Sequence, residues 1–232
     1  MFIVLIVLSI AVSSVFSNEN YFVISLVIAA AIIVILLLSY GRKNDSAHKL
    51  ALLSCMTAIS VFGRAAFAGI PFFKPVTAIV IICGIHLGAE SGAVCGVMSA
   101  FLSNFLFTQG PWTPFQMLIW GIIGLFSGLL KDTLKEKPFS LYIWGGITGI
   151  LFSLFMDIWT TLWWDSAFNS ERYLALIIAA LPVTLIYCVS NAVFLVLLAK
   201  PLGKKIHRIK VKYGIDIQFP ENEEQEKTDS TE

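Results

Sequence analysis

The sequence predicts an all-α integral membrane protein, a bundle of six core helices preceded by an extra apolar hairpin. Hydrophobic residues make up 57% of the 232-residue chain and charged residues only 13%, about half the charged fraction of a soluble domain. The mean hydropathy is +0.83. Apolar runs of about 17 residues or more, long enough to cross the hydrocarbon layer, recur along the chain.

Six of these runs form the predicted core. The second is short for a hydrocarbon layer of about 30 Å at 1.5 Å per residue. We therefore expect it to extend into its flanks or to lie in a sheltered position. The six predicted spans are 50–69, 75–89, 91–107, 115–131, 139–161 and 173–199.

Two further apolar runs, 2–17 and 21–40, precede the core. They are interpreted as a hairpin that turns at 18–20, or as a signal-like segment cleaved after about residue 17. The predicted domains are a hairpin and linker over 1–46, a core over 47–200 and a tail over 201–232. The end of the tail is acidic and polar, so we expect it to be disordered.

Basic loops predict the orientation in the membrane. Positive residues cluster before the first core span, between the fourth and fifth, and after the sixth, and with six spans all three clusters fall on one side. That side is predicted to be the cytoplasm, where the basic part of the tail could also contact anionic lipid. The clusters are Arg42, Lys43 and Lys49; Lys131, Lys135 and Lys137; and Lys200, Lys204, Lys205, Arg208, Lys210 and Lys212.

Sequence motifs for catalysis are missing. The chain has no G-x-x-x-x-G-K-[ST] phosphate loop, no H-E-x-x-H metal pair and no G-x-S-x-G nucleophile turn. The four cysteines show no C-x-x-C spacing. We therefore expect neither an enzyme nor a bound cofactor, and without the phosphate loop the chain does not hydrolyse ATP on its own by that route.

Polar and aromatic residues gather at the predicted outer half of five spans. An interfacial aromatic belt explains part of the tryptophans, and interhelical hydrogen bonds could explain Asn104 or Asn191 taken alone. Taken together, the residues predict a ligand pocket with aromatic walls and a few polar anchors. The candidate binding residues are Arg64, Lys74, Asn104, Gln109, Trp112, Gln116, Asp157, Trp159, Trp163, Tyr187 and Asn191.

The charged members of this set leave two interpretations open. Arg64 and Lys74 could pair with Asp157 and Asp165 to shape the pocket, or they could contact charged groups on the ligand.

Small residues predict close helix contacts. Gly84, Gly88, Gly92 and Gly96 recur every four residues around the turn between the second and third spans, a spacing that lets helix backbones approach in lipid. A second small face on the first core helix could pack against this chain or receive a helix from a partner subunit. It consists of Ala47, Ala51, Ser54 and Ala58.

Three features together resemble a known family. They are the Ala-x-x-x-Ala face at Ala47 and Ala51, the glycine-spaced second and third helices, and the segment Gln109-Gly-Pro-Trp-Thr-Pro-Phe-Gln116. The chain resembles, over about residues 47–200, the substrate-binding S components of energy-coupling factor (ECF) vitamin transporters. The hairpin before the core and the long tail depart from the usual pattern of that family.

The resemblance implies a mechanism. The S component would capture a vitamin or related micronutrient outside the cell and dock on a transmembrane T component through Ala47 and Ala51. Two cytoplasmic ABC ATPases would drive uptake. The branch that carries the Gly-Pro-Trp-Thr-Pro string suggests a cobalamin-type or other vitamin substrate. Two alternatives are a membrane enzyme that uses Asp157 or Asp165 with Arg64, and a structural or assembly protein without a ligand.

Overall fold

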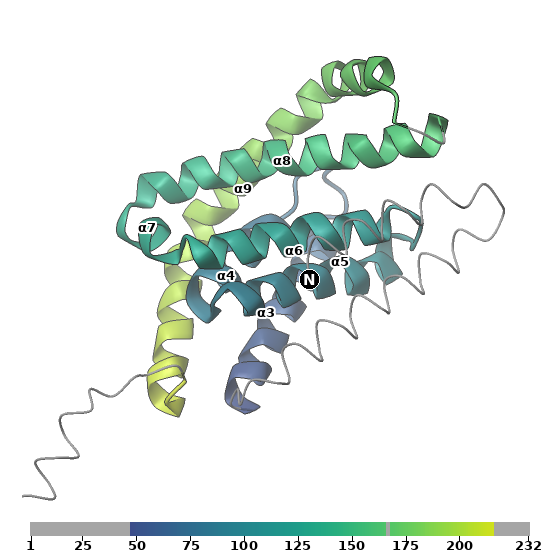
Figure 1. Ribbon diagram of the computed structural model, residues 1–232. Helices are drawn as coiled ribbons and strands as arrows, with labels where there is room; N and C mark the ends of the chain where they lie inside the picture. Colours follow the sequence, from purple (N-terminus) through teal and green to yellow (C-terminus); the bar gives the residue numbers. More distant parts are fainter. Residues whose placement is uncertain (1–46, 166–167, 216–232) are drawn as a thin grey trace, which may run out of the picture.

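The described part of the chain is entirely helical, as predicted. The computed structural model describes residues 47–165 and 168–215. The expected N-terminal hairpin, its possible cleavage and the acidic end of the tail lie outside the described residues. Within the described ranges there are seven helices (Figure 1): α3 (Ala47–Ala66), α4 (Val76–Leu87), α5 (Ala89–Phe107), α6 (Thr113–Leu129), α7 (Lys131–Glu136), α8 (Pro138–Asp165) and α9 (Ser170–Tyr213).

Four of the described helices, α3, α5, α8 and α9, are long and apolar enough to cross a membrane, and α4 and α6 are shorter apolar helices. At 12 residues, α4 is only about 18 Å long. Every residue of α4 except His86 is buried, so this helix occupies the sheltered position that its shortness predicts.

The helices pack as two units, α3–α6 and the α8–α9 pair, which also meet where α9 packs against α4. The tightest pairs are α5 with α6 and α8 with α9, and α4 lies against both α5 and α6. Figure 1 shows α8 running alongside α6, with α9 passing behind them. The cavity described below lies between the α3–α6 unit and the α8–α9 pair.

Glycines hold α4, α5 and α6 together at backbone distance. A Cβ atom placed on Gly92 would lie 2.4 Å from the Gly124 carbonyl oxygen, and one placed on Gly124 would lie 2.1 Å from the Gly92 carbonyl oxygen. No side chain fits into such a gap. The glycines spaced every four residues in the sequence therefore lie where α5 and α6 cross, at positions that leave no room for a larger side chain.

The largest differences from the predicted spans are the length of the last helix and an additional short helix. The last helix was expected to end at residue 199 but continues through Pro201 to Tyr213. Its Lys- and Arg-rich extension forms helix readily, and Gly214 ends it in a left-handed conformation with φ of 62°. The basic loop between the fourth and fifth spans contains the short helix α7, which the sequence pattern did not predict.

Candidate functional site

A cavity of about 450 Å³ opens between the two units. All six of the longer helices, or the loops next to them, contribute to its wall. The residues that line it are Arg64, Ala68, Pro71, Phe72, Lys74, Val76, Thr77, Phe107, Gln116, Trp120, Gly149, Phe152, Tyr187 and Asn191.

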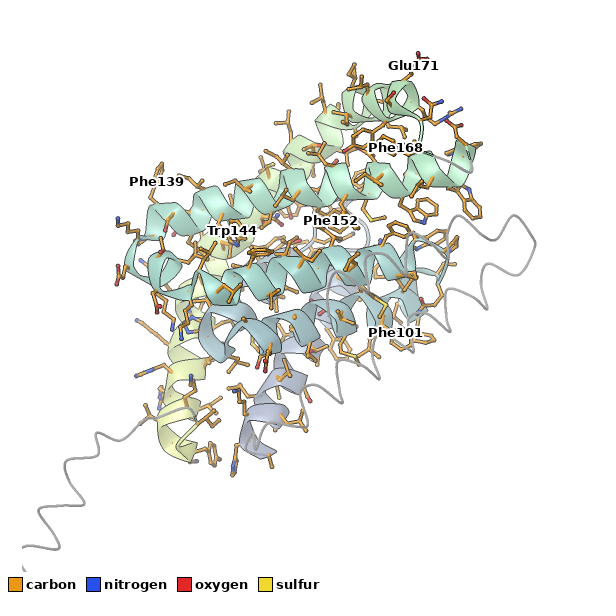
Figure 2. The ribbon with its side chains drawn as sticks, viewed as in Figure 1. Phe101, Phe139, Trp144, Phe152, Phe168 and Glu171 are labelled. Atoms are coloured by element: carbon orange, nitrogen blue, oxygen red, sulfur yellow. The ribbon has the colours of Figure 1, made fainter. Side chains whose placement is uncertain are left out.

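Aromatic rings form much of this wall. Trp120 of α6 and Phe152 of α8 are stacked, with ring centroids 5.1 Å apart and planes inclined by 20°. Tyr187 of α9 packs edge-on against Phe152 at 5.1 Å. Figure 2 shows Phe152 on the side of α8 that faces α6. A hydrogen bond to α4 orients the Trp120 ring, because its Nε1 donates to Thr77 Oγ1 at 3.1 Å.

Polar side chains connect the cavity to the loop between α5 and α6. Arg64 Nη1 donates to Asn104 Oδ1 at 2.8 Å, and Asn104 Nδ2 donates to Gln116 Oε1 and Thr113 Oγ1, both at 2.9 Å. Thr113 in turn donates to Gln109 Oε1 at 2.9 Å. Asn104 is fully buried, so these bonds satisfy a side chain that would otherwise destabilise the fold.

The same loop is fastened to α8. Trp159 Nε1 donates a hydrogen bond of 3.0 Å to the carbonyl oxygen of Pro111. The Trp112 ring packs edge-on against Trp159 at 6.1 Å, and Trp163 stacks on Trp159 at 5.5 Å. These contacts join the two units at the loop end of the bundle.

The loop between α3 and α4 forms the mouth of the cavity. Lys74 Nζ donates hydrogen bonds to the carbonyl oxygens of Phe67 and Ile70, the latter at 2.8 Å. Phe72 has a φ of 59°, a conformation that costs a bulky residue roughly 1–3 kcal/mol. The bonds from Lys74 help to hold this loop shape against that cost.

Two cations face the cavity beside one ring. The Arg64 guanidinium carbon lies 4.8 Å from the centroid of Phe107, and Lys74 Nζ lies 5.9 Å from the same centroid. Partial burial lowers the pKa of the Lys74 ammonium, and the positive charge of Arg64 lowers this pKa further. The two positive groups therefore repel each other.

Apart from Asp157, the predicted binding residues fall into three groups. Arg64, Lys74, Gln116, Tyr187 and Asn191 line the cavity. Asn104 and Gln109 belong to the hydrogen-bond network behind its wall. Trp112, Trp159 and Trp163 form the aromatic contact at the loop end.

Asp157 does not line the cavity, and its buried Oδ2 has no hydrogen-bond partner among the described residues. The ion pairs considered for it and for Asp165 are not found in the described chain. Asp165 pairs instead with Arg172, across the turn between α8 and α9, at 2.6 Å.

Sequence reasoning missed the apolar half of the wall. Trp120, Phe152 and Phe107 line the cavity but stand in strongly apolar runs, and Phe72 lines it from the loop between the first two spans. A signal was available for Trp120, because it follows Gln116 by four residues and therefore shares its helix face.

The predicted docking face is accessible along part of its length. Ala47, Ala51 and Ser54 are exposed and Ala58 is half-buried. The other described helices therefore do not cover this surface of α3 completely. Its role in docking stays a prediction.

The fold and the cavity define a class: an all-helical membrane protein that encloses a space of small-molecule size between its helices. Comparison with protein families identifies the class more closely. A family model described as "ECF-type riboflavin transporter, S component" matches residues 44–207. Searches of curated proteins and of solved structures gave no match.

The family match covers more than two thirds of the chain. The chain therefore belongs to the S components of ECF-type transporters, as its sequence motifs predicted. This is a family of transporter subunits and not a class of enzymes.

Proposed function

We propose that this chain is the subunit that captures a flavin outside the cell and delivers it for ATP-driven uptake. A transmembrane T component and two cytoplasmic ABC ATPases would complete the transporter. The observation that carries the proposal is the aromatic cavity between the two helical units of a chain whose family description names riboflavin.

The chemistry of riboflavin suits the wall. Its three fused rings are flat and polarisable, and flat rings pack favourably on aromatic side chains such as Trp120, Phe152 and Tyr187. Its ring edge and ribityl chain carry many donors and acceptors. Within the described residues the Gln116 side chain uses only Oε1 for hydrogen bonding, so its Nε2 can donate to a ligand.

Cavity size favours a flavin over the cobalamin-type ligand considered from the sequence. A cavity of about 450 Å³ lies in the lower part of the range for small-molecule sites, about 300–1,000 Å³. A corrinoid, with its macrocycle and nucleotide loop, is several times larger than riboflavin. The wall would have to open widely to admit it.

The proposed orientation draws support from contacts among the basic segments. Lys210 Nζ donates to the carbonyl oxygen of His86 at 3.2 Å, and the His48 and Tyr213 rings stack at 4.4 Å. The start of α3, the end of α4 and the end of α9 therefore meet at one end of the bundle. An even number of spans between the basic clusters, with that end in the cytoplasm, accounts for this arrangement.

Equilibrium titration of purified protein tests the proposal, with flavin fluorescence as the readout. Ala68 lines the cavity at its mouth and is exposed, whereas Ala66 is exposed and does not line it. We expect riboflavin to bind the wild type and the matched control Ala66→Trp with similar affinity. Ala68→Trp should weaken binding by about tenfold or more, a loss of at least about 1.4 kcal/mol.

Two results would count against the proposal. One is the failure of the folded wild type to bind any flavin. The other is equal binding by Ala68→Trp and Ala66→Trp, which would place the ligand elsewhere.

A further inference from the structure

The cavity carries positive charge without an acidic partner. Arg64 and Lys74 both line it, and none of its described lining residues is acidic. Asp157 stands outside the lining, and Asp165 is committed to Arg172. The positive charge of the wall is therefore not balanced by a carboxylate of the cavity itself.

Neutral groups satisfy only part of the donor capacity of these cations. Within the described residues, both hydrogen bonds of the Arg64 side chain use Nη1, to Ser103 at 2.5 Å and to Asn104 at 2.8 Å. Nε and Nη2 remain for a ligand. Lys74 Nζ bonds to two carbonyl oxygens, which orient the ammonium but leave its charge uncompensated.

Placing two like charges beside the same ring costs free energy. An anion between them would recover that cost, because charge-assisted hydrogen bonds are about twice as strong as neutral ones. Both cations lie within 6 Å of the Phe107 centroid, which places them at one end of the wall. The stacked pair Trp120 and Phe152 adjoins this end, because the Arg64 guanidinium carbon also lies 5.4 Å from the centroid of the Trp120 ring.

We propose that the cavity prefers a flavin that carries a phosphate, with the anion held by Arg64 and Lys74 beside Phe107. This inference rests on the proposed function, since it names the form of the flavin that the same cavity takes. Neutral riboflavin fits the aromatic wall but leaves the two cations without a counter-ion. Riboflavin 5′-phosphate supplies the counter-ion at the end of its ribityl chain.

The test compares riboflavin with riboflavin 5′-phosphate by fluorescence titration of the full-length protein in detergent. In the wild type at low salt, the phosphate form should bind about tenfold more tightly or better. That advantage should shrink as salt is added, because salt screens partly exposed charges.

Two variants address the cations separately. Lys74→Met removes one positive charge from the wall and should reduce the ratio of the two affinities, that of the phosphate form to that of riboflavin, whatever the change in riboflavin affinity itself. Asn104→Asp keeps the side-chain shape and places a carboxylate beside Arg64 Nη1, where it supplies an internal counter-ion and loses the two hydrogen bonds that Nδ2 donates to Thr113 and Gln116. It should also reduce the advantage, and it provides a readout if Lys74→Met disturbs the α3–α4 loop. Lys131→Met, an exposed cation at the start of α7, is the matched control and should behave as the wild type.

The possible outcomes separate this inference from the proposed function. If riboflavin binds as tightly as its phosphate, or if neither Lys74→Met nor Asn104→Asp changes the affinity ratio, the preference for phosphate is wrong and flavin binding stands. If neither flavin binds the folded wild type, the proposed function fails and this inference with it.

Discussion

Gly124→Ala is the substitution that should disturb the bundle most for the smallest chemical change. The added Cβ would lie 2.1 Å from the Gly92 carbonyl oxygen and 2.3 Å from its carbonyl carbon. These are backbone atoms of a neighbouring helix and cannot rotate away. To restore ordinary contact, α5 and α6 would have to separate by more than about 1 Å.

The cost follows from this geometry. Overpacking a tightly packed interior costs about 1–3 kcal/mol. The upper end applies here, because separation of the helices would also loosen the contact of Gly96 with the backbone of Trp120. A loss of about 3 kcal/mol corresponds to a fall in Tm of about 6–12 °C for a chain of this size. Ligand affinity should fall too, since Asn104 of α5 would move away from Gln116 of α6.

Thermal unfolding in detergent measures the change, with Gly146→Ala as the matched control. No atom lies within 4 Å of a Cβ placed on Gly146, and alanine favours helix by about 1 kcal/mol over glycine. The control should therefore unfold at the wild-type temperature or slightly above it. Equal unfolding temperatures for the two variants would refute the claim that α5 and α6 touch through their backbones.

Three other substitutions test the loop and the docking face. Trp159→Phe keeps an aromatic ring in place but loses the hydrogen bond to the Pro111 carbonyl oxygen. The lost bond contributes about 0.5–1.5 kcal/mol to holding the loop, so flavin release should be several-fold faster in a stopped-flow assay. Unchanged release would show that this bond does not restrain the loop. Trp112→Ala should lower flavin affinity in the titration, because it removes the contact with Trp159 that holds the loop against α8. The Tm should fall less than for Gly124→Ala, since Trp112 is only half-buried, and a larger fall would instead assign it to the packing of the bundle. Ala51→Trp should abolish flavin uptake by cells while leaving binding by the purified protein intact, and normal uptake would remove this face from the docking surface.

Sequence pattern predicted the helices well where long apolar runs define them. The predicted spans 91–107 and 115–131 correspond to α5 and α6 within two residues at each end. The end of α9 was missed because a run of lysines reads as a soluble tail. A helix that leaves the membrane keeps its backbone hydrogen bonds in water, so the change of solvent does not end it.

The cavity was predicted by its polar residues and missed at its aromatic ones. Arg64 and Asn191 stand out in the sequence because a polar group at membrane depth needs a partner. Phe152 does not stand out in the sequence, because a phenylalanine in an apolar run can equally face lipid, the core or a ligand. Which face of α8 turns inward depends on how the two units pack, and this packing is absent from the local pattern.

The ion pair between Asp165 and Arg172 could not be predicted from the sequence either. Asp165 and Arg172 lie at the ends of successive helices, and whether they meet depends on the path of the turn between them.

An experimental structure of the protein with bound riboflavin tests the proposed site most directly. We expect density for three fused rings in the cavity between the α3–α6 unit and the α8–α9 pair, packed against Trp120 and Phe152. Density for the flavin at any other place, with this cavity empty, would contradict this expectation.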